Sequence, residues 1–223
     1  MPLIKRWIEV FPVTDFISIG MLLSVVAVVS IKRMEGCLRA YVINSWLLAG
    51  LMAAFAVWLS IPHLYIAAFF TIAGKCVLIP FFLRRIMRNL KIEPGAQSSY
   101  LNTPASLIIS FALVVLVYSF ISAGVFVAGA ARNVLKISVS IILISLFMMI
   151  TRKKAVSQVM GLLFMENGLF LAGFSLTYGM PTIIELGVLF DMLMGVMILG
   201  LFLTQIKKSF VSVDLDRLTS LKG

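Results

Sequence analysis

The stretch Gly161–Phe170, GLLFMENGLF, contains the main features of this chain within ten residues. Eight of the ten are stable in an apolar environment, whereas a carboxylate and an amide, Glu166 and Asn167, lie at the centre. The apolar run extends from Ala155 to Thr177, and a helix of that length crosses a hydrocarbon core of about 30 Å. The stretch therefore predicts a membrane-spanning helix with a buried ionisable group.

The composition of the whole chain predicts a membrane protein. Of its 223 residues, 61% are hydrophobic and 13% are charged, whereas soluble domains have about 45–50% apolar and about 25% charged residues. The pattern disfavours a β-barrel, because barrel strands alternate apolar and polar residues and these segments are apolar on all sides. We therefore expect an all-α, multi-pass membrane protein.

The apolar runs predict about seven transmembrane helices. The tightest link is Ile61-Pro62, where the proline breaks the helix. No small-residue cleavage site follows the first run, so it is interpreted as a retained helix rather than a signal peptide. The predicted spans are Thr14–Ile31, Leu38–Ile61, Pro62–Leu83, Thr103–Val127, Val134–Ile150, Ala155–Thr177 and Thr182–Ile206.

The net charge of +10 is distributed unevenly between the links. The links around His63 and Tyr178 carry no formal charge, and the link near Arg132 carries little. Such alternation follows the positive-inside rule, and it predicts an outer N-terminus and a cytoplasmic C-terminus. The basic residues then face membrane lipids and cytoplasmic partners, not nucleic acid. They cluster at Lys32-Arg33 with Arg39, Arg84-Arg85 with Arg88 and Lys91, Arg152-Lys153-Lys154, and Lys207-Lys208.

Few residues of the chain could ligate a metal or a cofactor. Cys37 lies in a predicted cytoplasmic link, Cys76 lies within the third span, and His63 is the single histidine. These positions have no metal-ligand spacing and do not predict a disulfide. We expect no catalytic residue, metal site or cofactor site in this chain.

Four ionisable residues lie within the predicted spans: Lys75, Glu166, Glu185 and Asp191. A charge at the centre of a bilayer costs at least about 2.5–3.5 kcal/mol. The helical rise places Glu166 about 16 Å into its span, near the midplane. Asp191 lies at a similar depth, Lys75 lies toward the cytoplasm, and Glu185 lies near the outer surface.

Each of these residues has a structural and a functional interpretation. Lys75 is either paired or hydrated, or its long stem reaches toward the cytoplasmic surface. Glu185 is either part of an ion path or an interfacial carboxylate. Glu166 and Asp191 are too short to reach the surface, so each is either a proton carrier or a neutral, hydrogen-bonded structural group.

Glycines near both midplane carboxylates favour the proton-carrier hypothesis. Gly187 and Gly195 lie one turn from Asp191 on the same helix face, and Gly161 and Gly173 flank Glu166 at a looser spacing. Small residues allow close helix approach or leave room for water. Burial and a second carboxylate both favour a neutral carboxyl, so the two are predicted to exchange protons as a pair.

Several motifs resemble the hydrogenase-4 component E family. They are Lys75 followed by Leu78-Ile79-Pro80, the run Met165-Glu166-Asn167-Gly168, and the tail with Asp216-Arg217-Leu218 and Leu221-Lys222-Gly223. The last three predicted helices, about Val134–Lys208, are similar to the K subunit of bacterial complex I. In that resemblance Glu166 matches the first buried glutamate of the K subunit, and Asp191 stands where the second usually is.

The resemblance implies three parts and a role in a larger complex. Residues 1–132 form a four-helix membrane part, residues 133–208 form the K-like part, and residues 209–223 form a cytoplasmic tail. The chain would be a non-catalytic membrane subunit of a group 4 hydrogenase-related oxidoreductase in a bacterial cytoplasmic membrane. Glu166, Asp191, Lys75 and Glu185 would then contribute to proton or cation translocation.

The expected partners also follow from the resemblance. They are antiporter-like membrane subunits, a membrane protein that resembles the quinone-binding membrane component of complex I, and a cytoplasmic hydrogenase-like arm. Iron–sulfur clusters, with or without a nickel–iron centre, would lie in those partners. Two alternatives stay open: a structural subunit that joins larger pumps, and a component of a multisubunit cation/proton antiporter.

Overall fold

The structure is a computed structural model that describes residues 2–59, 65, 68–69, 71–89, 99–124, 131–177, 187 and 195. The described residues form helices and no strand, and Ser99 and Arg152 make one isolated β-bridge. The helices in chain order are α1 (Pro2–Ser30), α2 (Met34–Leu59), the π-helix η1 (Ile72–Leu78), α4 (Ile79–Asn89), α5 (Thr103–Gly124), α6 (Ala131–Thr151) and α7 (Ala155–Thr177).

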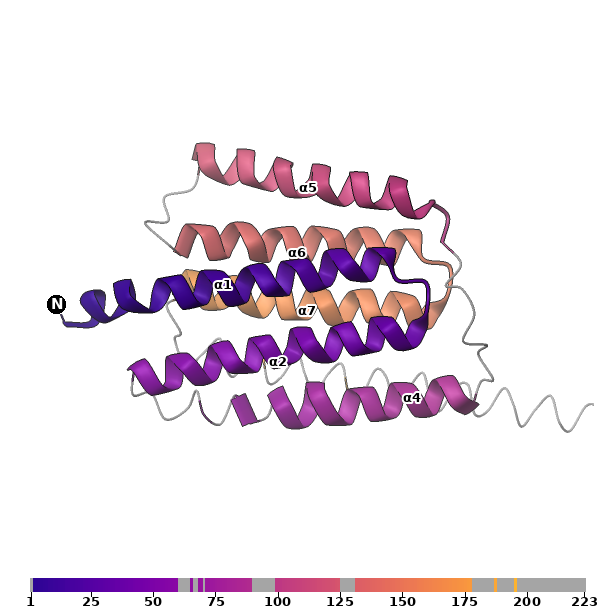
Figure 1. Ribbon diagram of the computed structural model, residues 1–223, viewed down its shortest axis with the longest axis horizontal. Coiled ribbons are helices and arrows are strands. Elements are labelled where there is room, and N and C mark those ends of the chain that lie inside the picture. The colour runs from indigo at the N-terminus through magenta and orange to yellow at the C-terminus, as the bar shows by residue number, and fades with distance from the viewer. Residues whose placement is uncertain are drawn as a thin grey trace, which may run out of the picture.

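These helices lie side by side in one bundle, with α5 at one edge and α4 at the other (Figure 1). Helix α6 packs against α7, α1 and α5, while α2 packs against α1, α7 and η1. Helices α1, α2, α6 and α7 therefore form the centre of the bundle, and η1 with α4 lies against it through α2. Short links in the sequence produce antiparallel neighbours.

Five of the described helices are long and apolar enough to cross a membrane, judged by length and composition. They correspond to the first, second, fourth, fifth and sixth predicted spans, and α7 has the predicted bounds Ala155–Thr177. The third predicted span is described only in part. The seventh lies outside the described residues except for Gly187 and Gly195.

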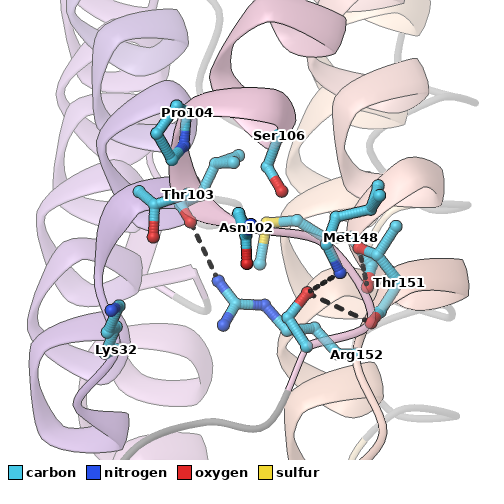
Figure 2. A pocket seen from close by; sticks show the side chains of 11 residues that line it. Lys32, Asn102, Thr103, Pro104, Ser106, Met148, Thr151 and Arg152 are labelled. Atoms are coloured by element: carbon cyan, nitrogen blue, oxygen red, sulfur yellow. Dashed lines mark hydrogen bonds between the residues drawn. The ribbon is translucent and has the colours of Figure 1, made fainter.

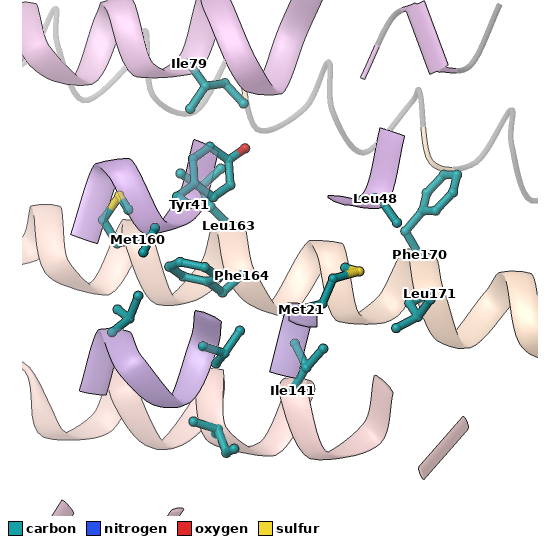
Figure 3. Close-up of a cluster of buried hydrophobic side chains, with 14 of the residues drawn as sticks. Met21, Tyr41, Leu48, Ile79, Ile141, Met160, Leu163, Phe164, Phe170 and Leu171 are labelled. Atoms are coloured by element: carbon teal, nitrogen blue, oxygen red, sulfur yellow. The ribbon is translucent and has the colours of Figure 1, made fainter. Parts of the chain in front are cut away.

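The interior of the bundle is filled by apolar side chains from all four central helices (Figure 3). The rings of Tyr41 on α2 and Phe164 on α7 meet edge to face, with centroids 5.7 Å apart. Both side chains are fully buried, so this contact fixes how α2 lies against α7. The outer face of α5 is different, because it exposes Ile108, Phe111, Val115, Leu116 and Phe120. An apolar face of this size is typical of a membrane or partner contact.

Two glycines allow α7 to approach α6 closely. A Cβ at Gly161 would lie 2.7 Å from Met149 Cγ, and one at Gly168 would lie 2.8 Å from Ile141 Cγ2. The two glycines are seven residues apart and so share one face of α7. Of the two roles expected for small residues, close helix approach or room for water, Gly161 therefore has the first, and it faces α6 rather than the side of Glu166. The reason is that a separation of five residues rotates it by about 140° around the helix.

Candidate functional site

Lys75 and Glu166 form an ion pair inside the bundle. Lys75 Nζ on η1 lies 3.2 Å from Glu166 Oε1 on α7. Only 1% of Lys75 and 6% of Glu166 is exposed. Lys75 is therefore paired with a carboxylate in the structure, and its stem does not extend to the surface of the bundle. Removing each ion from water costs several kcal/mol, and the attraction between the two charges offsets that cost.

The π-helix around Lys75 has a local cause in the sequence. Pro80 lies two residues after the end of η1. Proline lacks the N–H that would bond the carbonyl four residues earlier, and its ring also clashes with that carbonyl. The backbone widens ahead of the proline, so the N–H of Ile79 donates to Gly74 O, five residues back. Such wide turns often occur at functional sites. Here the π-helical turn contains Lys75, whose ammonium contacts side chains of α7.

Asn167, the neighbour of Glu166, also binds Lys75. Lys75 Nζ donates a hydrogen bond of 2.9 Å to Asn167 Oδ1. Asn167 Nδ2 in turn donates to Asn44 Oδ1 at 2.9 Å and to Ser45 Oγ at 3.2 Å, both on α2. Because the ammonium has only donors, it requires the oxygen of the amide to face it. The orientation of Asn167 therefore follows from its partners.

The polar chain continues from α2 to α1. Asn44 Nδ2 donates to Ser24 Oγ at 2.6 Å and to Met21 O at 3.0 Å. Ser24 Oγ donates to the same carbonyl at 2.7 Å. Asn44, Ser45 and Asn167 are all fully buried. Hydrogen bonds thus run in one direction from Lys75 through two amides to the backbone of α1, and they join η1, α7, α2 and α1.

The structure brings together two of the four predicted site residues. Lys75 and Glu166 meet, whereas Glu185 and Asp191 lie outside the described residues. A Cβ at Gly187 would clash with the ring of Phe170, so Gly187 lies against α7 one turn beyond Glu166. At Gly195 such an atom would meet nothing within 4 Å.

Asn44 and Ser45 were missed by the sequence analysis, although both lie in an apolar span. Asparagine at membrane depth is itself a signal, because its amide must find hydrogen-bond partners there. Within the described residues no group of three or more His, Cys, Asp or Glu side chains could hold a metal ion.

The arrangement can change its charge by one unit while it keeps its geometry. With Glu166 ionised, the carboxylate and the ammonium compensate each other. If Glu166 takes up a proton, Lys75 still donates to Asn167 Oδ1, so the ammonium stays anchored. The pair can therefore alternate between a neutral and a cationic state, as a proton relay requires.

Comparisons with known proteins give two kinds of relative. The chain is 25% identical over 205 residues to hydrogenase-4 component E of Escherichia coli K12, covering 91% of this chain and 94% of that protein. The same protein from Shigella flexneri gives the same values. An uncharacterised protein of Mycobacterium tuberculosis, Rv0085, is 31% identical over 152 residues, which is 68% of this chain and 69% of that protein.

No family model matches the chain, and no solved structure matches it. The full-length match to hydrogenase-4 component E agrees with the motifs around Lys75 and Glu166. The chain is therefore similar to hydrogenase-4 component E over nearly its whole length.

Proposed function

We propose that this chain is a membrane subunit of a hydrogenase-related redox complex, and that its buried Lys75–Glu166 pair belongs to a proton or cation path. The ion pair inside the bundle is the observation that carries the proposal. Ionisable residues at membrane depth are rare and mostly mark ion pathways or proton relays. The name of the related protein supports membership of a hydrogenase complex.

The proposed mechanism begins with a charge shift in a partner arm that holds the redox centres. Oxidation or reduction there changes the field along the polar interior, and Glu166 takes up or releases a proton in response. Lys75 supplies the counter-charge and is held by Asn167. Asp191 is proposed as the next proton site, and Glu185 is proposed to take part nearer the outer surface. Antiporter-like partners and a quinone-binding membrane partner would continue the path.

The seven-span topology, with an outer N-terminus and a cytoplasmic C-terminus, is part of the proposal. The α1–α2 link with Lys32 and Arg33, the C-terminal end of α4 and the α6–α7 link all lie at the same end of the bundle (Figure 1). This gathering of basic residues supports a cytoplasmic position for that end, because positive residues favour the cytoplasmic surface. A bacterial cytoplasmic membrane is the proposed location.

A structural role is the second candidate. The amides of Asn167 and Asn44 are bonded on both sides, and such a network can serve simply to fix four segments against one another. In that case the chain joins larger pumping subunits and carries no protons. The third alternative, a subunit of a cation/proton antiporter, differs in its partners, which would include no redox arm.

The experiment compares carboxylate-to-amide variants of the whole complex in proteoliposomes. Glu166→Gln and Asp191→Asn keep the side-chain volume and cannot release a proton, so protons moved per electron should fall while subunit content stays normal. Glu35→Gln is the matched control, because Glu35 lies exposed in the first turn of α2. Unchanged proton-to-electron ratios in both interior variants would leave the structural role. Asp191→Glu should preserve the ratio.

A further inference from the structure

A pocket of about 570 Å³ lies at the basic end of the bundle, away from the ion pair. It is bounded by the end of α1, the segment that leads into α5, and the end of α6 (Figure 2). Its volume is in the range of small-molecule sites, about 300–1,000 Å³. The residues that line it are Val29, Lys32, Ser99, Leu101, Asn102, Thr103, Pro104, Ser106, Met148, Thr151 and Arg152.

The charged side chains that line the pocket are all positive. Lys32 and Arg152 are its ionisable residues, and none of the described lining residues is a carboxylate. Arg152 is only 5% exposed, and no described carboxylate forms a salt bridge with it. Arginine stays protonated in proteins, so a buried positive charge lies beside the pocket without an acidic partner among the described residues. Figure 2 shows Lys32, Thr103 and Arg152 around the same space.

The walls are held in place by hydrogen bonds. Arg152 Nη2 donates to Val29 O at 3.1 Å and to the carbonyls of Val28 and Ile31 at 3.3 and 3.5 Å. Val28 and Val29 belong to the last turn of α1, where carbonyls lack partners within the helix, and Ile31 follows that helix. All three bonds use one nitrogen of the guanidinium. On the other side the Tyr100 N–H donates to Thr151 O at 3.0 Å. The pocket is therefore a built site and not a gap between loose ends.

Helix α5 adds to the positive potential of the pocket. The Ser106 N–H donates to Asn102 O at 3.0 Å, so the first turn of α5 begins at the pocket, and the positive end of its dipole lies there. Apolar side chains, Val29, Leu101 and Met148, line the remainder. This combination of cations, polar groups and an apolar wall suits an anionic headgroup with a less polar body.

The position at the membrane surface identifies the class of ligand. Tyr100 is 71% exposed and lies under Lys153, whose Nζ is 4.4 Å from the ring centroid. An aromatic ring with a basic neighbour at the end of apolar helices is typical of the lipid headgroup region. Basic pockets between transmembrane helices on the cytoplasmic side bind phospholipid headgroups. We propose that this pocket binds a phosphate-bearing anion, with the headgroup of an anionic phospholipid as its source.

The test uses the purified full chain in phosphatidylcholine nanodiscs, to which cardiolipin or inorganic phosphate is added. Retained cardiolipin is counted by native mass spectrometry, and its dissociation constant is measured by titration. Lys32→Gln should weaken cardiolipin binding about fivefold, since one basic residue near the surface contributes about 1 kcal/mol. Arg33→Gln is the matched control, because Arg33 is an exposed neighbouring cation outside the lining, and it should bind like the unmodified chain.

Arg152→Gln also removes bonds to the end of α1, so Lys32→Gln and Arg33→Gln are the two variants that decide the test. Inorganic phosphate separates the two sources of the ligand. If it binds with the same Lys32 dependence and cardiolipin does not, the phosphate site is correct and a free phosphate is its ligand. The proposal would be overturned if each probe bound with the same affinity to three proteins: the unmodified chain, Lys32→Gln and Arg33→Gln.

Discussion

Lys75 Nζ and Glu166 Oε1 lie 3.2 Å apart in the interior of the bundle, although the two residues belong to segments far apart in the sequence. Each explains why the other is tolerated at that depth. The carboxylate balances the ammonium, and Asn167 supplies a second acceptor for it. The proposed proton chemistry and the side-chain link between η1 and α7 therefore depend on the same contact.

The pair makes the stability of the two single variants interdependent. Lys75→Met leaves Glu166 without its counter-charge and should reduce the stability of the folded chain by about 3–5 kcal/mol. The double variant Lys75→Met with Glu166→Gln removes both charges, so it should recover most of that loss while proton coupling stays low. Thermal unfolding in detergent and proton transport measure the two effects separately.

Lys75→Arg keeps the positive charge, so it should lose less stability than Lys75→Met. It should still be less stable than the unmodified chain, because the planar guanidinium differs in shape from the ammonium. Normal assembly and coupling in Lys75→Met would contradict the role of the pair.

Asn167 should contribute to stability through both of its partners. Asn167→Leu removes the acceptor of Lys75 and the donor to Asn44, and each buried group left unsatisfied costs about 1–3 kcal/mol. Asn44→Leu breaks the same bond from the other side. If the two amides form one network, the double variant should lose less stability than the sum of the single losses. Additive losses, measured by thermal unfolding, would contradict a shared network.

The glycine face of α7 gives a prediction with an internal control. Gly168→Ala places a methyl group 2.8 Å from Ile141 Cγ2 and 3.2 Å from Ser138 O. Overpacking of this kind costs about 1–3 kcal/mol, so α6 and α7 should separate and the melting temperature should fall. Gly50→Ala, where a Cβ meets nothing within 4 Å, should be neutral or slightly stabilising. Equal melting temperatures for the two variants would refute tight packing at Gly168.

The proposed orientation can be tested without the complex. An alkaline phosphatase reporter fused after Lys154 should be inactive and a fluorescent protein at the same place should fluoresce, because that link is proposed to be cytoplasmic. The same two reporters at the C-terminus should behave alike. Phosphatase activity at either site would contradict the proposed orientation. It would also contradict the assignment of the pocket to the cytoplasmic surface.

Part of the site follows from local sequence alone. The membrane-spanning nature of α7 and its bounds, Ala155–Thr177, were predicted because helix length and apolar content are local properties to which a bilayer responds directly. The importance of Lys75 and Glu166 was predicted for the same reason, since a charge inside an apolar run is costly wherever the helix points. The roles of Glu185 and Asp191 stay predictions.

The partners of these residues depended on tertiary structure. A helix that is apolar on all sides has no polar face that reveals its rotation, so nothing in the run around Asn44 indicates that its amide meets Asn167. The same holds for Gly161, which lies against α6, and for the approach of Arg152 to the end of α1. The sequence determined which segments are helical and which residues need partners. The rotation and register of the packed helices decided which partners they have, because those depend on side-chain contacts between segments distant in the chain.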